Sequence, residues 1–138
     1  MAYDLNANFN TESFKAASVI NFGAAVQLNS AVAFSVVPAS AASNGLSIAY
    51  GIAKATAASV GVNVPVQTGG WSKAIAGASL GIGAYVGVGV GTSYLVPIGA
   101  SGVAAASGNI KYAVGISLEA AAAGSLFTVR LGSPVEVV

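Results

Sequence analysis

The chain has 138 residues and a net charge of +1; only 7% of the residues are charged, whereas 55% are hydrophobic. It contains no histidine and no cysteine, which excludes disulfides, thiolate metal sites and histidine-based catalysis. The near-zero net charge and the absence of a basic cluster leave no electrostatic footprint for nucleic acid.

The small number of charges predicts an assembled protein. A folded monomer of this mass exposes on the order of 6,400 Å², and the chain has five basic and four acidic side chains to cover it. Each charge then serves roughly 700 Å², more than the largest apolar patch of a typical monomer, about 300–600 Å². We therefore expect another protein surface to cover part of this one.

Residues 1–17 form a polar segment that carries isolated apolar side chains at Leu5, Phe9 and Phe14. Two interpretations stand: a frayed terminus, or an extended arm whose apolar groups dock on a neighbouring subunit. We assign residues 1–17 to such an arm and residues 18–138 to one β-domain. The segment has neither the basic start nor the apolar run of a secretory signal, so we expect the protein to be made and used without Sec export.

From residue 18 the chain alternates between short apolar runs and turn signals, a pattern typical of strands. Pro65 cannot donate to a ladder, which places its strand at a sheet edge or places the proline near the strand's start. The segment 74–80 fits either a short helix or a strand. The pattern predicts an all-β barrel or sandwich, with strands at 18–28, 31–37, 46–53, 62–67, 83–90 and 93–98.

The stretch 74–100 has no charge and is long enough to span a bilayer. It is, however, dense in glycine, a poor helix former, and Pro97 interrupts it. Residues 86–91 alternate Val and Gly, which places the valines on one face of a strand. We expect a strand here and no membrane partner.

Two segments of nearly equal length resemble each other. One runs from Gly51-Ile52-Ala53 to Gly69 and the other from Gly115-Ile116-Ser117 to Gly132. Each reads as a strand, a turn of small residues and a return strand. The sequence therefore predicts a duplicated strand–turn–strand unit.

Sites for chemistry are scarce. The glycines of 81–87 do not have the spacing of a dinucleotide-binding loop, and no βαβ pattern surrounds them. A serine nucleophile would have only lysine or a carboxylate as its base. The four acidic residues are dispersed and form no evident metal-ligand set. We expect no enzymatic activity, no metal and no cofactor.

Two other features leave alternatives open. Trp71 follows two glycines and is either an interface anchor or a plug at a barrel end. Glu119 and Arg130 lie in the same repeat copy, where a hairpin would bring them together as a weak surface pair.

The second repeat copy, 112–131, has a turn Glu119-Ala-Ala-Ala-Ala-Gly124 that leads into the strand Val129-Arg130-Leu131. This motif resembles the closing segment of the capsid decoration, or cement, proteins of tailed phages, some of them long mislabelled as recombinases. The earlier copy, 51–69, resembles a related segment of that family, and the resemblance covers 46–131. The chain departs from the family in having fewer acidic residues before the return strands, and its polar N-terminal segment is not part of the family pattern.

The resemblance implies a small β-barrel-like subunit, commonly a trimer, on the outside of an icosahedral phage shell, with no active site. The leading hypothesis is thus a virion cement subunit that clamps neighbouring copies of the major capsid protein. Its interface candidates are Leu5, Phe9, Phe14 and Trp71. The alternative, motivated by the Val/Gly alternation, is a self-assembling shell, fibre or pore subunit, including a membrane-active one.

Overall fold

The structure, a computed structural model, describes residues 11–39, 49–89, 92–98 and 112–136, and these form strands and connecting turns without any helix. The predicted all-β fold is confirmed. The strands are β1 (Thr11–Ala16), β2 (Ala25–Leu28), β3 (Ser35–Pro38), β4 (Gly51–Ala53), β5 (Asn63–Gln67), β6 (Gly70–Ile75), β7 (Tyr85–Val88), β8 (Leu95–Pro97), β9 (Tyr112–Ser117) and β10 (Leu126–Glu136).

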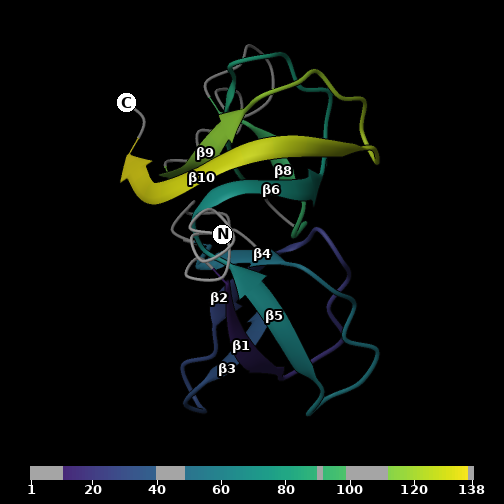
Figure 1. Ribbon diagram of the computed structural model, residues 1–138, viewed down its shortest axis with the longest axis vertical. Coiled ribbons are helices and arrows are strands. Elements are labelled where there is room, and N and C mark those ends of the chain that lie inside the picture. The colour runs from purple at the N-terminus through teal and green to yellow at the C-terminus, as the bar shows by residue number, and fades with distance from the viewer. Residues whose placement is uncertain (1–10, 40–48, 90–91, 99–111, 137–138) are drawn as a thin grey trace, which may run out of the picture.

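The strands form two sheets that follow one another along the chain. The first closes into a barrel in the order β1-β3-β2-β4-β5, and the second has the order β6-β10-β9-β7-β8. We call residues 11–69 the first unit and residues 70–136 the second unit. Figure 1 shows them one above the other along the longest axis of the molecule.

The two units are copies of one fold. β1 pairs with β5 as β6 pairs with β10, and β2 lies between β3 and β4 as β7 lies between β8 and β9. The register is also repeated, because Val26 lies opposite Gly51 and Val86 lies opposite Gly115. The duplication is therefore larger than the predicted one: the segments 51–69 and 115–132 are its second halves.

The turns between equivalent strands repeat as well. The chain after β1 bridges Ile20 to Ala57, and the chain after β6 bridges Leu80 to Ala121 in the same antiparallel sense. The turns before β5 and β10 each contain a glycine with positive φ, Gly61 at 89° and Gly124 at 85°. Only glycine adopts this conformation without a steric cost, so the same residue type marks both turns.

Each unit has a core built from alternating strand positions. In the first unit Phe14 of β1 lies opposite Val64 of β5, whereas in the second Ala74 of β6 lies opposite Phe127 of β10. The aromatic ring has thus changed strands between the copies, with a small side chain facing it in each. Each pair thus combines one phenylalanine with one smaller side chain, although Val64 is larger than Ala74.

The structure shortens the predicted arm. Thr11–Ala16, inside the segment 1–17 that we assigned to the arm, is strand β1 of the barrel. Phe14 is only 6% exposed and packs edge-on against the Tyr50 ring at 5.4 Å. The strand alternates, so its apolar side chains point into the protein's own core and not toward a neighbour. Leu5 and Phe9 lie outside the described residues.

Pro65 has a different setting from the expected one. Its strand, β5, pairs on both sides, with β1 and with β4, so it is not a sheet edge. The Lys54 N–H donates to the Pro65 carbonyl at 2.8 Å, and β4 ends one residue earlier, at Ala53. The proline therefore falls where the ladder to β4 stops, and a missing N–H is tolerated there.

Candidate interaction surfaces

The two units are joined by a short piece of the first that enters the second. The Ile75 N–H donates to the Gly23 carbonyl at 3.1 Å, and the Ala25 N–H donates to the Ser93 carbonyl at 2.8 Å. Residues 23–25 thus lie between β6 and the start of β8. The same place in the first unit is closed directly, because the Lys15 N–H donates to the Phe34 carbonyl at 3.0 Å.

This insertion explains a difference between the sheets. β1 and β3 form a parallel ladder, whereas their counterparts β6 and β8 share one bridge, between Ala76 and Leu95. The hydrophobic core of the second unit accordingly includes four side chains from the first, Ala25, Ala39, Ala49 and Ile52. The second unit is completed by the first.

Hydrogen bonds from polar side chains of the first unit to residues of the second lie at this junction. The Gln67 amide donates to the carbonyls of Gly69 at 2.7 Å and Trp71 at 2.6 Å. The Lys54 ammonium donates to the Ser72 hydroxyl at 3.4 Å, and partial burial lowers the pKa of Lys54. These bonds pair polar groups that the apolar contact would otherwise leave unsatisfied.

The outer face of the second sheet carries a row of four directly opposed residues. Trp71 lies opposite Arg130, Arg130 opposite Ile116, and Ile116 opposite Tyr85, across β6, β10, β9 and β7. Directly opposed residues project from the same face of a sheet. We call these four residues the outer row; Trp71 is 71% exposed and Tyr85 48%.

The counterpart of the outer row in the first unit is buried except at Thr11, which is partly buried. It consists of Thr11, Gln67, Ile52 and Ala25, which are opposed in the same order. Ile52 and Ala25 are fully buried in the core shared with the second unit. One face of the fold is therefore an interface in the first unit and is exposed in the second.

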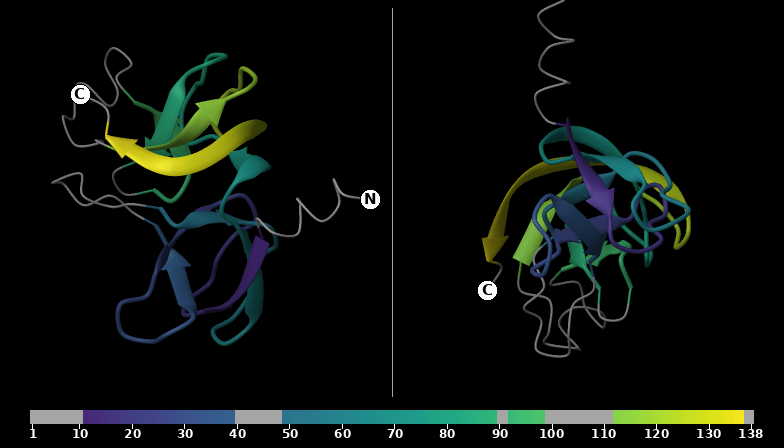
Figure 2. Two further views of the ribbon diagram at one scale, coloured as in Figure 1. Left: turned by 60° about the vertical axis from the view of Figure 1, so that its left-hand side comes forward. Right: turned by 90° about the horizontal axis from the view of Figure 1, so that it is seen from below.

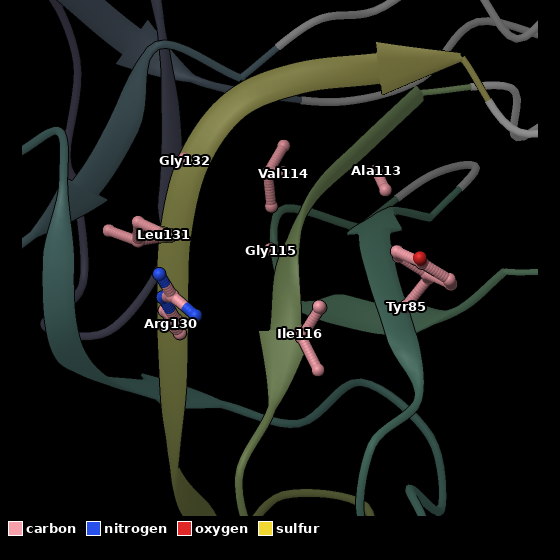
Figure 3. A pocket seen from close by; sticks show the side chains of 8 residues that line it. All are labelled: Tyr85, Ala113, Val114, Gly115, Ile116, Arg130, Leu131 and Gly132. Atoms are coloured by element: carbon pink, nitrogen blue, oxygen red, sulfur yellow. The ribbon is translucent and has the colours of Figure 1, made fainter.

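A groove of about 360 Å³ follows part of the outer row. Figure 3 shows Arg130, Ile116 and Tyr85 side by side on three strands along it. The groove coincides with an irregularity in which three residues of β10, 132–134, oppose the single residue Val114 of β9. It is lined by Tyr85, Ala113, Val114, Gly115, Ile116, Arg130, Leu131 and Gly132.

The charge pair differs from the one we considered. Glu119 pairs with Lys73 at 3.1 Å and not with Arg130. Its carboxylate also accepts bonds from the Thr128 hydroxyl at 2.7 Å and the Thr128 N–H at 2.8 Å. The Thr128 hydroxyl, and after it Lys73, lower the pKa of Glu119. Lys73 lies directly opposite Thr128 in the β6–β10 ladder, which is why it reaches the carboxylate.

The four interface candidates therefore do not form one site. Phe14 is in the core of the first unit, Trp71 is on the outer face of the second, and Leu5 and Phe9 are outside the described residues. Trp71 is too exposed to plug a barrel end. Sequence reasoning missed Tyr85, Ile116 and Arg130, which become neighbours of Trp71 only through strand register.

Within the described ranges, no three histidine, cysteine, aspartate or glutamate side chains come close enough together to hold a metal ion. Those ranges also contain no helix of the length and apolarity needed to cross a membrane. The features that remain for function are surfaces, above all the outer face of the second sheet.

Comparison with known structures finds a protein with a similar fold. The chain is similar to the head fibre gp8.5 N base of bacteriophage phi29, with a TM-score of 0.62 and 15% sequence identity. The match covers 93% of this chain and 97% of the other. No protein-family model and no curated protein sequence matches the chain. At this identity the similarity establishes a common fold.

Proposed function

We propose that the protein is a structural component of a bacteriophage head and has no enzymatic activity. The observation that carries this proposal is the fold that it shares with the phi29 head fibre base over nearly the full length of both chains. Because the match covers nearly all of both chains, it is a similarity of whole folds and not of one shared fragment. The proposal also fits a chain without histidine or cysteine.

We propose further that the protein sits on the capsid exterior and bridges neighbouring copies of the major capsid protein, as a homotrimer. Exposed large apolar side chains, among them Phe34, Trp71 and Ile82, supply surface for such contacts, since few charges compete for it. A ligand that binds only the assembled shell stabilises that shell by mass action. This part of the proposal agrees with the resemblance to cement proteins.

Reconstitution tests both parts. Purified protein is added to heads of the encoding phage that lack it, and bound copies are located by cryo-electron microscopy. We expect density on the outer surface and a higher temperature of head disruption. Mass spectrometry of purified virions provides the second readout, and absence of the protein from virions would refute the proposal.

A second candidate is a self-assembling fibre, shell or pore subunit. The exposed apolar side chains of both units, such as Phe34 and Ile82, favour the fibre version of it. Liposome flotation separates the membrane-active version, since recovery of the protein with vesicles is expected only of a pore subunit.

A further inference from the structure

The junction within the chain joins one surface of the first unit to a different surface of the second unit. Because the two units share one fold, each also carries the equivalent of the surface that the other uses, and these two equivalent surfaces are uncovered. We propose that these two uncovered surfaces bind each other between molecules, so that the second unit of one chain docks on the first unit of a second copy. The contact would repeat, between chains, the junction that the duplication has already built within one chain. This inference stands independently of the proposed function.

The first of the two surfaces is the outer face of the second unit. In the first unit the counterpart of residues 83–85 is the turn at 23–25, which is buried in the junction, and the counterpart of Ile82 is the partly buried Phe22. In the second unit, Gly83 and Tyr85 are exposed, and Ile82 is 77% exposed. We call Ile82, Gly83, Tyr85, Ile116 and Arg130 the docking face.

The backbone of the docking face has the same turn conformation as the buried turn at 23–25. Gly23 and Gly83 have nearly the same positive φ, 80° and 78°. The Gly23 carbonyl accepts a bond from the second unit and the Ala25 N–H donates one to it. Their counterparts, the Gly83 carbonyl and the Tyr85 N–H, have no hydrogen-bond partner among the described residues. A protein surface that covers this apolar turn must satisfy both groups.

The second surface is the end of the first unit that lies farthest from the second, where the β2–β3 loop is (Figure 2). Its counterparts in the second unit are Ile75, Val88 and Ser93, of which Ile75 and Ser93 form the backbone bonds to the turn at 23–25. In the first unit the same positions are Lys15, Leu28 and Phe34, all exposed, with Phe34 at 81%. We call Lys15, Leu28, Val32 and Phe34 the receiving end.

Phe34 shows that the receiving end is closed at a cost. Its φ of 55° is unique among the described non-glycine residues, and this region is sterically unfavourable for a bulky side chain. Its carbonyl accepts the Lys15 N–H, the bond that is replaced in the second unit by bonds to the inserted turn. Insertion of a docking face would exchange this single bond for two and release Phe34 from its backbone conformation.

A second copy of the chain is the occupant that the molecule itself specifies. Apart from Arg130 on the docking face and Lys15 on the receiving end, both surfaces carry apolar side chains. The internal junction shows that a turn of this kind fits between the corresponding strands of the other unit. Because the two surfaces differ, the contact is head-to-tail, and such contacts either close into a ring or continue as a filament. A trimeric ring is one closure of this kind.

Two single-surface variants test the proposal in the full-length protein. Ile82→Asp places a charge on the docking face at an exposed turn position. Phe34→Asp places one on the receiving end, and aspartate tolerates a positive φ better than phenylalanine does, so folding is preserved. Val19→Asp is the matched control, because Val19 is 55% exposed and its counterpart Ser79 takes no part in the junction bonds. Tyr85→Ser is a second, uncharged docking-face variant.

Native mass spectrometry and light scattering across a concentration series give the readout. We expect the wild type and Val19→Asp to be oligomeric, and each single-surface variant to associate at least about 30-fold more weakly. An equimolar mixture of Ile82→Asp and Phe34→Asp should form a 1:1 dimer and nothing larger, since it retains one intact contact. A monomeric wild type, unchanged association of the variants, or a mixture that stays monomeric would each overturn the proposal.

Discussion

The first and second units share their topology and register but differ in how one end is closed. The first closes β1 to β3 through its own backbone, whereas the second accepts residues 23–25 between β6 and β8. The difference shows that a duplicated β-unit does not have to bury the same face twice. It can use that face as a joint in one copy and leave it available for a partner in the other.

The largest expected effect on folding comes from comparing a deletion that ends before β1 with one that removes β1. Deletion of residues 2–10 should leave the β-fold intact. Deletion of residues 2–16 removes the strand between β3 and β5, opens the barrel and exposes its core. Circular dichroism and hydrogen exchange should report a folded protein in the first case and loss of protection in β2–β5 in the second. Retained protection after the longer deletion would contradict the assigned register.

Removal of the aromatic ring from each core compares the two units next. Phe127→Ala leaves a cavity opposite Ala74 and should lower the free energy of unfolding by about 3–5 kcal/mol. Phe14→Ala should cost less, since Val64 opposite it is larger than Ala74. Chemical denaturation gives both values, and equal or reversed losses would contradict this order.

The double variant Ala74→Phe with Phe127→Val recreates in the second unit the arrangement of the first. It should unfold at a higher denaturant concentration than Phe127→Ala. If it is no more stable, the two cores do not share the geometry that their registers indicate.

Matched glycine substitutions in the two units measure how much the packing of the junction contributes to stability. Gly23 and Gly83 have the same backbone conformation, so alanine at either position costs about 1 kcal/mol through φ alone. At Gly23 the added Cβ also comes within 2.9 Å of the Ile75 side chain, whereas at Gly83 it meets nothing within 4 Å. Gly23→Ala should therefore be more destabilising by a further 1–3 kcal/mol or so. Thermal unfolding measures the difference, and equal losses would mean that the junction is not tightly packed.

The smallest effect concerns the Glu119 cluster, which the first unit lacks, since Ser13, Ala55 and Pro65 occupy the positions of Lys73, Glu119 and Thr128. The pKa of Glu119 is lowered in the folded protein. Its contribution to stability is therefore present above the pKa of an unfolded-chain glutamate and is lost as the pH falls through the lower, folded value.

Glu119→Gln should remove this small acid-side loss and leave the remaining pH dependence unchanged. Denaturation midpoints measured from neutral to acidic pH give the comparison, with Glu12→Gln as the control carboxylate. Parallel profiles for wild type and Glu119→Gln would show that the cluster does not contribute.

The sequence alone predicted half of the duplication. The copies 51–69 and 115–132 keep Gly-Ile at the start and Gly at the end, and side-chain identity made them visible. The other halves, β1–β3 and β6–β8, share only short traces, such as Gly-Ala-x-Val at 23–26 and 83–86 and Val-Pro at 37–38 and 96–97. The core phenylalanine lies on β1 in the first unit, at Phe14, and on β10 in the second, at Phe127, so it does not align between the two units in the sequence.

Local chemistry therefore determined what each segment is. Period-two alternation, glycines and prolines predicted strands and turns in an all-β protein, because those preferences act within a few residues. The tertiary structure decided which faces meet. Phe14 belongs to the core and not to an arm because β5 pairs with β1, and Trp71, Arg130, Ile116 and Tyr85 form one row because four strands share a register. Register depends on contacts between residues up to 59 positions apart in that row, and no local pattern encodes them.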